Sequence, residues 1–303
     1  MVSTYSEAGV DIDASERATE ALIAQIKGVN RKGDGEAIKL DNGFAGLVKL
    51  GDGALAMCTD GVGSKLLLAE EMDSIHTVGI DCVAMNTNDL ICVGAEPLSF
   101  VDYVALDKPD EELMAKIGKG LAEGCRQSNC TLSGGETAIL PELVHGFDIA
   151  GTSVGYVKQD KIIDGTKISE GDVLIGLKSS GPHSNGYTLI RKLFDGDKEL
   201  GKKLVEPTRI YVKEVMALIK QVDVHGIAHI TGGGLDNISR INDNFQYVID
   251  NPLPVPSIFD WLQEKGSVED KEMYRTFNMG MGMLIIVNKD DAEKSVSILG
   301  EHA

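Results

Sequence analysis

The spacing of apolar residues along the chain predicts helices that alternate with short strands. Apolar side chains recur every four positions within residues 15–26 and again within 110–128, which is the repeat of an amphipathic helix. Gly120 and Gly124 share one stripe of the second predicted helix, which indicates close packing of that helix against a sheet. Short apolar runs bounded by Gly, Asp or Pro predict strands at 45–50, 54–59, 75–80, 98–106 and 147–157.

A polar, turn-rich segment at 158–171 divides the chain. We place a domain boundary there and expect an N-terminal domain over 1–166 and a C-terminal domain over 167–303. The sequence therefore predicts a two-domain α/β protein of the α+β type. In the second half we expect strands at 172–177 and 283–287 and helices at 185–194 and 208–221.

The composition argues against several classes of function. The 303 residues carry a formal net charge of −18, which disfavours nucleic acid and anionic membranes as partners. Apolar stretches fall short of the roughly 20 residues that span a bilayer, and residues 1–13 lack the features of a signal peptide. Five cysteines without a Cys-x-x-Cys pair argue against zinc or a disulfide framework. We expect a cytoplasmic protein.

Residues 59–65, Thr-Asp-Gly-Val-Gly-Ser-Lys, carry the most informative chemistry. They follow a predicted strand and place a carboxylate, two glycines, a hydroxyl and a lysine in one turn. A carboxylate can hold a cation, glycines let backbone N–H groups approach a phosphate, and a lysine neutralises its charge. The Walker A spacing is absent, and alone the segment fits an ordinary glycine-rich turn at least as well. The candidate residues are Asp60, Gly61, Gly63, Ser64 and Lys65.

Acidic residues follow several apolar runs of the first half. Asp81 is expected to end a strand at 77–80, and Glu136 lies in the segment 134–137. Strand ends of an α/β sheet gather at one edge, so these carboxylates would converge and repel one another unless a cation such as Mg²⁺ lay among them. Each one alone is better explained as a helix cap or a turn residue, and only the four together favour a metal–nucleotide site. The predicted metal ligands are Asp60, Asp81, Asp89 and Glu136, with Asn86 as a further candidate.

Two loops of the second half could hold an anion. Residues 179–187 lie between a predicted strand and a predicted helix, where hydroxyls, an imidazole and an amide could hold a phosphate. A plain N-cap with His183 facing solvent explains that loop nearly as well. Residues 225–234 end in Thr231 and three glycines, a pattern that fits an anion-binding nest. The histidines of the second loop are also typical of satisfied core residues, and no zinc-ligand spacing occurs.

Taken in order, these segments resemble one family, the aminoimidazole ribonucleotide synthetases, or phosphoribosylformylglycinamidine cyclo-ligases, of purine synthesis. The resemblance runs over nearly the whole chain, and its most specific motifs are Gly-Pro-His-Ser-Asn-Gly-Tyr and Met-Tyr-Arg-Thr-Phe-Asn. The matching stretches are 5–13, 25–29, 59–65, 79–90, 94–97, 134–137, 181–187, 208–212, 228–234 and 272–278.

The resemblance implies a homodimer of two-domain subunits, in which the N-terminal domains join strands into an interface β-barrel and ATP binds beside it. It implies that formylglycinamidine ribonucleotide and ATP give aminoimidazole ribonucleotide, ADP and phosphate. In the implied mechanism, ATP phosphorylates the formyl amide oxygen, a nitrogen attacks the activated carbon, and phosphate leaves. Such chemistry depends on positioning and charge neutralisation more than on a protein nucleophile.

The resemblance also implies roles for individual residues. Catalysis and phosphate neutralisation are assigned to Lys65, with His183 and Asn185. Binding of ATP with Mg²⁺ is assigned to Lys27, Asp60, Gly61, Gly63, Ser64, Asp81, Asn86, Asp89, Gly134, Gly135, Glu136 and Thr137. The ribonucleotide phosphate or the amidine is assigned to Ser184, His229, Thr231, Gly232, Gly233 and Gly234.

Departures from the family pattern keep alternatives open. Ser64 stands where the family usually has Thr, and residues 235–237 replace an aromatic-acidic-Asn pattern. The family normally continues beyond residue 303 through another strand, which leaves the last strand of the C-terminal domain in question. The alternatives are another ATP-using member of the superfamily or a non-catalytic nucleotide-binding dimer. Selenophosphate synthetase is disfavoured because the first cysteine is Cys58.

Overall fold

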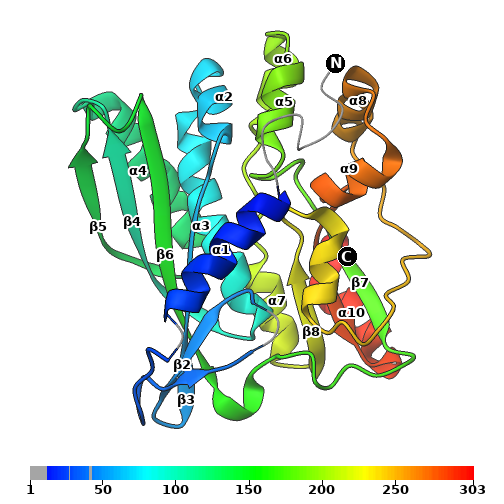
Figure 1. Cartoon of the computed structure of the whole chain (residues 1–303). Coiled ribbons are helices and arrows are strands. Elements are labelled where there is room, and N and C mark those ends of the chain that lie inside the picture. The colour runs from blue at the N-terminus through cyan, green and yellow to red at the C-terminus, as the bar shows by residue number, and fades with distance from the viewer. Residues whose placement is uncertain (1–11, 27, 41–42) are drawn as a thin grey trace.

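A computed structural model describes residues 12–26, 28–40 and 43–303, and its first half is built on a six-stranded sheet (Figure 1). The strand order is β1-β2-β3-β6-β4-β5, with β4 and β5 parallel and the other neighbours antiparallel. The strands are β1 (Ala37–Ile38), β2 (Gly46–Leu50), β3 (Gly53–Gly61), β4 (Glu96–Leu106), β5 (Thr131–Ile139) and β6 (Phe147–Lys158).

The second half has a smaller sheet in the order β7-β9-β8, surrounded by helices. Both of its pairings are antiparallel. Its strands are β7 (Val173–Lys178), β8 (Val224–His229) and β9 (Met281–Val287). Its helices are α5 (Tyr187–Leu193), α6 (Lys198–Leu204), α7 (Val212–Ile219), α8 (Ser257–Gly266), α9 (Asp270–Thr276) and α10 (Ala292–Leu299). Short 3₁₀ segments are η1 (Gln159–Lys161), η2 (Gly234–Arg240), η3 (Lys289–Asp291) and η4 (Gly300–His302).

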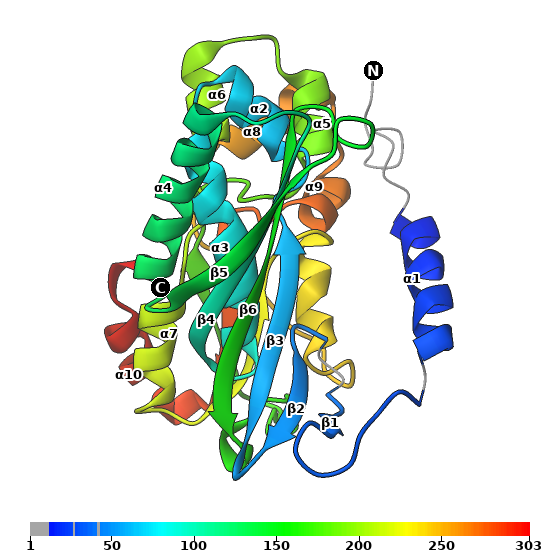
Figure 2. The same cartoon turned by 90° about the vertical axis from the view of Figure 1, so that its left-hand side faces the viewer.

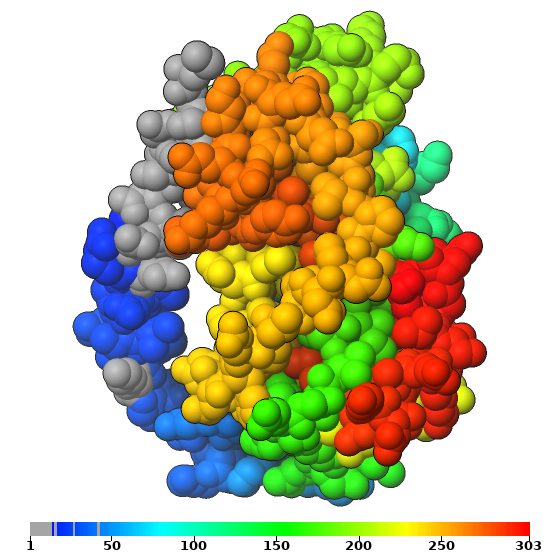
Figure 3. All heavy atoms as spheres, turned by 90° about the vertical axis from the view of Figure 1, so that its right-hand side faces the viewer, coloured from blue at the N-terminus to red at the C-terminus, as the bar shows by residue number. Residues whose placement is uncertain are grey.

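The remaining helices are α1 (Ile12–Ile26), α2 (Lys65–Glu71), α3 (Ile75–Cys92) and α4 (Glu111–Gln127). Figure 2 shows that α3 and α4 cover one face of the large sheet, whereas α1 stands apart from the body of the molecule. Figure 3 shows an opening between the blue helix α1 and the yellow segment around η2. Among the described helices, none has the length and apolar content needed to cross a membrane.

Helix α3 lies between the two halves and corrects one sequence prediction. The run 75–80 was expected to be a strand, and it forms the first turns of α3 instead. All residues of α3 except His76 and Asp89 are buried. A helix that is buried on every side has no polar stripe, so its sequence lacks the four-residue repeat and resembles a buried strand. Asp81 therefore lies inside a helix and not at a strand end.

Glycines allow α4 to approach another helix, which corrects a second prediction. Close packing was expected against a sheet, but the contact is with α3. A Cβ atom added to Gly120 would lie 2.1 Å from the His76 carbonyl oxygen, and one added to Gly124 would lie 2.8 Å from the Val83 side chain. The absence of side chains at these positions lets the two backbones come together.

Substitution of Gly120 by alanine is expected to destabilise the protein by about 1–3 kcal/mol, because the methyl group would force α3 and α4 apart. Gly118, on the same helix, has nothing within 4 Å of its added Cβ. Gly118→Ala is therefore the matched control, and we expect it to gain up to about 1 kcal/mol from helix propensity. Urea unfolding followed by circular dichroism measures both changes; equal effects would contradict the packing argument.

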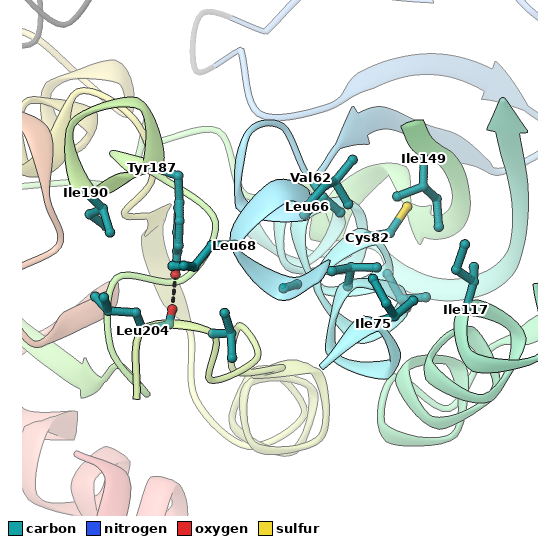
Figure 4. Close-up of a cluster of buried hydrophobic side chains, with 14 of the residues drawn as sticks. Val62, Leu66, Leu68, Ile75, Cys82, Ile117, Ile149, Tyr187, Ile190 and Leu204 are labelled. Atoms are coloured by element: carbon teal, nitrogen blue, oxygen red, sulfur yellow. Dashed lines mark hydrogen bonds between the residues drawn. The ribbon is translucent and has the colours of Figure 1, made fainter. Parts of the chain in front are cut away.

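One large hydrophobic cluster joins residues of both halves (Figure 4). Leu66 and Leu68 of α2 lie in the same cluster as Tyr187, Ile190 and Leu204 of the second half. The Tyr187 hydroxyl donates a hydrogen bond to the carbonyl oxygen of Leu204. The two halves of the chain are therefore held together by a shared apolar core as well as by α3.

Candidate active site

Lys65, at the start of α2, is fully buried and connects three separate segments. Its Nζ donates to Asp81 Oδ1 at 2.9 Å, to the His183 carbonyl oxygen at 2.7 Å and to the Glu206 carbonyl oxygen at 2.7 Å. Burial lowers the pKa of Lys65, and the Asp81 carboxylate opposes that shift. An ammonium group has three N–H donors. In this structure none is left for a phosphate oxygen, which differs from the role expected from sequence.

Asp81 is fully buried and accepts three hydrogen bonds on one oxygen. Besides Lys65, the backbone N–H and the hydroxyl of Thr208 each donate to Asp81 Oδ1 at 2.7 Å. The other oxygen, Oδ2, is buried without a partner among the described residues. Thr208 also lies 3.0 Å from Ser184, hydroxyl to hydroxyl. Sequence reasoning gave Thr208 no role, although it opens the matching segment 208–212.

The loop 183–185 lies beside the glycine loop that follows β8. His183 is buried with φ +60°, and its Nε2 accepts from the Ser180 N–H at 3.3 Å. Burial holds the pKa of His183 well below its usual range, so the imidazole is neutral. The solvent-facing alternative for His183 is therefore wrong. A Cβ at Gly232 would lie 3.3 Å from Asn185 Oδ1, which places the two loops in contact.

Two polar atoms of the loop 183–185 lack partners among the described residues. They are His183 Nδ1 and Asn185 Nδ2, and both are buried. Buried polar atoms are normally hydrogen-bonded to protein, water or ligand. Together with Asp81 Oδ2 and Asn86 Oδ1, they make up the unpartnered buried side-chain atoms of the described chain. All four belong to residues that the sequence marks as site candidates, and two of them, His183 and Asn185, lie on the loop beside the glycine loop.

The backbone of the glycine loop 231–234 is fixed by contacts with neighbouring residues. Gly233 and Gly234 have φ values of +95° and +56°, a region that favours glycine. A Cβ at Gly234 would lie 2.0 Å from the Tyr274 carbonyl oxygen. Asn237 Nδ2 donates to the carbonyl oxygens of Gly232 and Gly234 at 3.1 and 2.8 Å. The Asn that follows the loop thus fixes its backbone.

His229, at the end of β8, contacts α3 through both ring nitrogens. Nδ1 lies 2.8 Å from Asp89 Oδ1 and Nε2 lies 3.4 Å from Asn88 Nδ2. The Cys58 thiol donates to Asp89 Oδ2 at 3.6 Å. His229 is fully buried, whereas the Asp89 side chain is 19% exposed. His229 therefore orients Asp89, and the carboxylate rather than the imidazole reaches solvent.

Asp60, at the end of β3, lies close enough to Asp89 for the two charges to interact. Desolvation raises the pKa of Asp60, the Gly61 N–H lowers it, and Asp89 raises it again. Asp60 Oδ1 accepts from the Gly61 N–H at 2.7 Å, and the Asp60 carbonyl oxygen accepts from Asn86 Nδ2 at 3.2 Å. Repulsion between the Asp60 and Asp89 carboxylates is the kind that a bound cation relieves.

Glu136 projects from the opposite face of the sheet. Asp60 pairs with Gly151, Gly151 with Asp102, and Asp102 with Gly135, so these positions share the face covered by α3. Glu136 is the next residue along β5 and points to the other face. Within the described ranges, no group of three or more His, Cys, Asp or Glu side chains is arranged to hold a metal. The structure thus does not bring the four expected ligands together.

Asp102 is a neighbour of the site that sequence reasoning missed. A Cβ at Gly135 would lie 2.4 Å from its Oδ1, so glycine is needed there. Desolvation raises the pKa of Asp102. No Gly-rich or acidic motif surrounds it in the sequence, and only the strand pairing reveals its place.

The other predicted positions have modest local roles. Ser64 Oγ lies 3.4 Å from the Thr188 hydroxyl, and the Thr137 N–H donates to Glu136 Oε1 at 3.0 Å. Gly63, with φ +70°, and Gly134 have open space where a side chain would be. Lys27 lies outside the described residues.

Comparison with known proteins gives two family matches that cover most of the chain. Residues 42–157 match the AIR synthase related protein, N-terminal domain, and residues 169–303 match its C-terminal domain. A phosphoribosylformylglycinamidine cyclo-ligase of Methanosarcina acetivorans is 48% identical over 98% of this chain and 92% of its own length. One of Methanococcus maripaludis is 45% identical over 99% of this chain and 89% of its own length.

Solved structures share the fold at low sequence identity. A complex titled AaThiL with AMPPCP and TMP gives a TM-score of 0.64 at 15% identity, covering 91% of this chain and 85% of that one. The hydrogenase maturation protein HypE in complex with ATP gives 0.62 at 18% identity, covering 94% and 82%. These likenesses confirm the expected α/β fold class.

Proposed function

The chain belongs to the phosphoribosylformylglycinamidine cyclo-ligase family, and from that membership we infer that it is a ligase of purine biosynthesis that closes the ring of formylglycinamidine ribonucleotide with ATP. The products are 5-aminoimidazole ribonucleotide, ADP and phosphate. The observation that carries this conclusion is the identity of 48% over 98% of the chain. The match covers 98% of this chain and therefore both of its halves.

The proposed reaction has two steps. The formyl amide oxygen attacks the γ-phosphorus of ATP, and ADP leaves. A nitrogen of the substrate then attacks the activated formyl carbon, the C–O bond breaks, and inorganic phosphate departs as the ring forms. Both steps depend on alignment of the reacting atoms and on neutralisation of charge. The unpartnered atoms His183 Nδ1 and Asn185 Nδ2 support a place for the substrate between the two halves.

Asp60 and Asp89 are the residues we propose beside the phosphates of ATP. Mg²⁺ is commonly held by one or two carboxylates together with phosphate oxygens. The charge of Asp89, which adds to desolvation in raising the pKa of Asp60, supports such a site. When bound, Mg²⁺ would neutralise phosphate charge. We do not place Asp81 and Glu136 in the same ligand set, because Asp81 is paired with Lys65 and Glu136 lies on the other sheet face.

The direct test supplies the purified full chain with formylglycinamidine ribonucleotide, ATP and Mg²⁺. Formation of the aminoimidazole product is followed by a colour reaction, with ADP release measured in parallel. Product formation that depends on both substrates is expected. A folded protein that binds ATP but forms no product would favour the alternative of a non-catalytic nucleotide-binding protein.

We further propose that 1–166 and 167–303 are the two domains and that the chain acts as a cytoplasmic homodimer. An apolar patch on the large sheet supports the dimer. Met57, Val101 and Tyr103 are 38–43% exposed on the sheet face opposite α3. Exposed apolar side chains grouped in this way are typical of an interface.

Val101→Glu is expected to convert the dimer to a monomer, because the symmetric interface would bury the new carboxylate in both subunits. Light scattering after size exclusion should give twice 32.4 kDa for the parent chain and 32.4 kDa for the variant. Val248→Glu is the control, since Val248 is 66% exposed on a loop of the C-terminal half. A Val101→Glu protein that keeps the doubled mass would contradict an interface on this face.

A further inference from the structure

We propose that Ser184 is a specificity-determining residue that accepts a hydrogen bond from the amidine N–H of the substrate, and that Lys65, Asp81 and Thr208 are the positioning residues that fix its hydroxyl in this state. The proposal rests on the proposed function and deepens it. The sequence left open whether this loop holds a phosphate or the amidine. The order of hydrogen bonds in the structure distinguishes the two.

The chain of hydrogen bonds begins at a buried charge. Asp81 lies 2.9 Å from the Lys65 ammonium, and as a carboxylate it can only accept hydrogen bonds. The Thr208 hydroxyl lies 2.7 Å from Asp81 Oδ1 and therefore donates its single hydrogen to it. The Thr208 backbone N–H donates to the same oxygen, which fixes the position of the threonine.

The direction of the next bond follows. Thr208 Oγ1 has already donated its hydrogen, so its contact of 3.0 Å with Ser184 Oγ requires Ser184 to donate. A serine hydroxyl has one hydrogen and two lone pairs. Ser184 is only half-buried, and once its hydrogen is donated to Thr208 its hydroxyl has only lone pairs left for a further partner.

A lone-pair acceptor suits an N–H group and repels a phosphate oxygen. The amidine of the substrate carries N–H donors, whereas a phosphate has only acceptors at neutral pH. The neighbouring Asn185 Nδ2 is a donor without a partner among the described residues. Two adjacent residues of one loop thus offer an acceptor and a donor, which matches a substrate segment that carries both an amidine and a formyl oxygen.

The geometry also explains why a lysine is buried at this point. Lys65 donates to the His183 carbonyl oxygen, so it fixes the backbone immediately before Ser184. Lys65 also stabilises the charged form of Asp81. The Asp81 carboxylate in turn sets the direction of the Thr208 hydroxyl. The Lys65 ammonium group therefore controls both the position of Ser184 and the direction of its hydroxyl hydrogen, without contact to the reacting atoms.

The experiment compares two ligands that differ at one atom. Formylglycinamidine ribonucleotide is the first, and its analogue with an amide oxygen in place of the amidine nitrogen is the second. Dissociation constants without ATP are measured by calorimetry for the parent chain, Ser184→Ala, Thr208→Val and Thr208→Ser. The ratio of the two constants reports recognition at Ser184 and needs no turnover. KM for ATP serves as the control for the nucleotide site.

The parent chain is expected to prefer the amidine, and Ser184→Ala should reduce that preference by roughly tenfold, the contribution of one hydrogen bond. In Thr208→Val the Ser184 hydroxyl hydrogen is released and can turn towards the amide oxygen, so the ratio should fall at least as far. Thr208→Ser retains the hydroxyl and should restore the ratio. KM for ATP is expected to change less than twofold in all three variants.

Three results would overturn the proposal. One is an unchanged ratio in folded Ser184→Ala and Thr208→Val proteins. Another is a Ser184→Ala protein that loses affinity equally for both ligands, which would indicate a contact to the ribonucleotide phosphate that they share. The third is a Thr208→Ser protein that behaves like Thr208→Val, which would indicate a packing role. Failure of the proposed function is distinguishable, because the parent chain would then form no aminoimidazole product.

Discussion

Replacement of Lys65 by methionine is expected to lower the free energy of unfolding by about 3–5 kcal/mol, because the Asp81 carboxylate would remain buried without its cation. Methionine has a similar length and no charge, so steric change is small. The carbonyl oxygens of His183 and Glu206 would also lose a donor. Urea unfolding measures the stability, and the cyclo-ligase assay should show a loss of kcat that exceeds any change in KM for ATP.

Two further proteins separate charge from packing. Lys294→Met removes an exposed lysine that donates to the Gln221 carbonyl oxygen at 2.6 Å, and it should change stability by less than about 0.5 kcal/mol. The double variant Lys65→Met with Asp81→Asn removes both buried charges, and it should recover part of the lost stability. If Lys65→Met is as stable as Lys294→Met and mainly raises KM for ATP, Lys65 is a phosphate ligand after all.

Asp60→Asn is expected to lower kcat on the order of 100-fold, the size seen when one charged or polar group of an active site is removed. The substitution keeps the shape of the side chain and removes the charge that, with Asp89, would attract Mg²⁺. Its fold should be intact, since the described contacts of the Asp60 carboxylate are limited to the adjacent Gly61 N–H. Initial rates over a range of Mg²⁺ concentrations should show a higher Mg²⁺ requirement.

The matched control is Asp195→Asn, which removes a carboxylate from an exposed ion pair with Lys265 at 2.9 Å. Its rate and Mg²⁺ dependence should equal those of the parent chain. Circular dichroism confirms the fold of both variants. Unchanged turnover of a folded Asp60→Asn protein would remove Asp60 from the ATP site.

Much of the architecture follows from the sequence because most elements have one buried and one exposed face. Helix α4 shows the four-residue repeat, and its observed range, Glu111–Gln127, lies within the predicted 110–128. Strand β6, Phe147–Lys158, alternates buried and partly exposed residues and agrees with the predicted 147–157. Helix α3 escaped prediction because it has no exposed face.

The candidate site was predictable in its residues more than in its contacts. Asp81, Asn86, His183 and Asn185 were all chosen from sequence, and each has an unpartnered buried atom. Long-range geometry could not be deduced, since Lys65 meets carbonyl oxygens 118 and 141 residues away.

The face of Glu136 depends on strand pairing. The pairing of β4 with β5 is irregular: Phe100 pairs with Leu132, whereas the next residue, Val101, pairs with Gly134, so one residue of β5 is skipped. One extra residue in a strand reverses which side chains point to a given face. No local pattern in the sequence predicts this shift in strand register.

The burial of α3 limits how this enzyme can change over evolutionary time. The helix packs against Gly120 through His76 and carries Asp81 and Asn88 towards the second half. A substitution that improves packing on one side of α3 shifts polar groups on the other. Stabilising changes are therefore easier to accept on peripheral elements such as α10 than on this helix, whose polar groups are hydrogen-bonded to the second half.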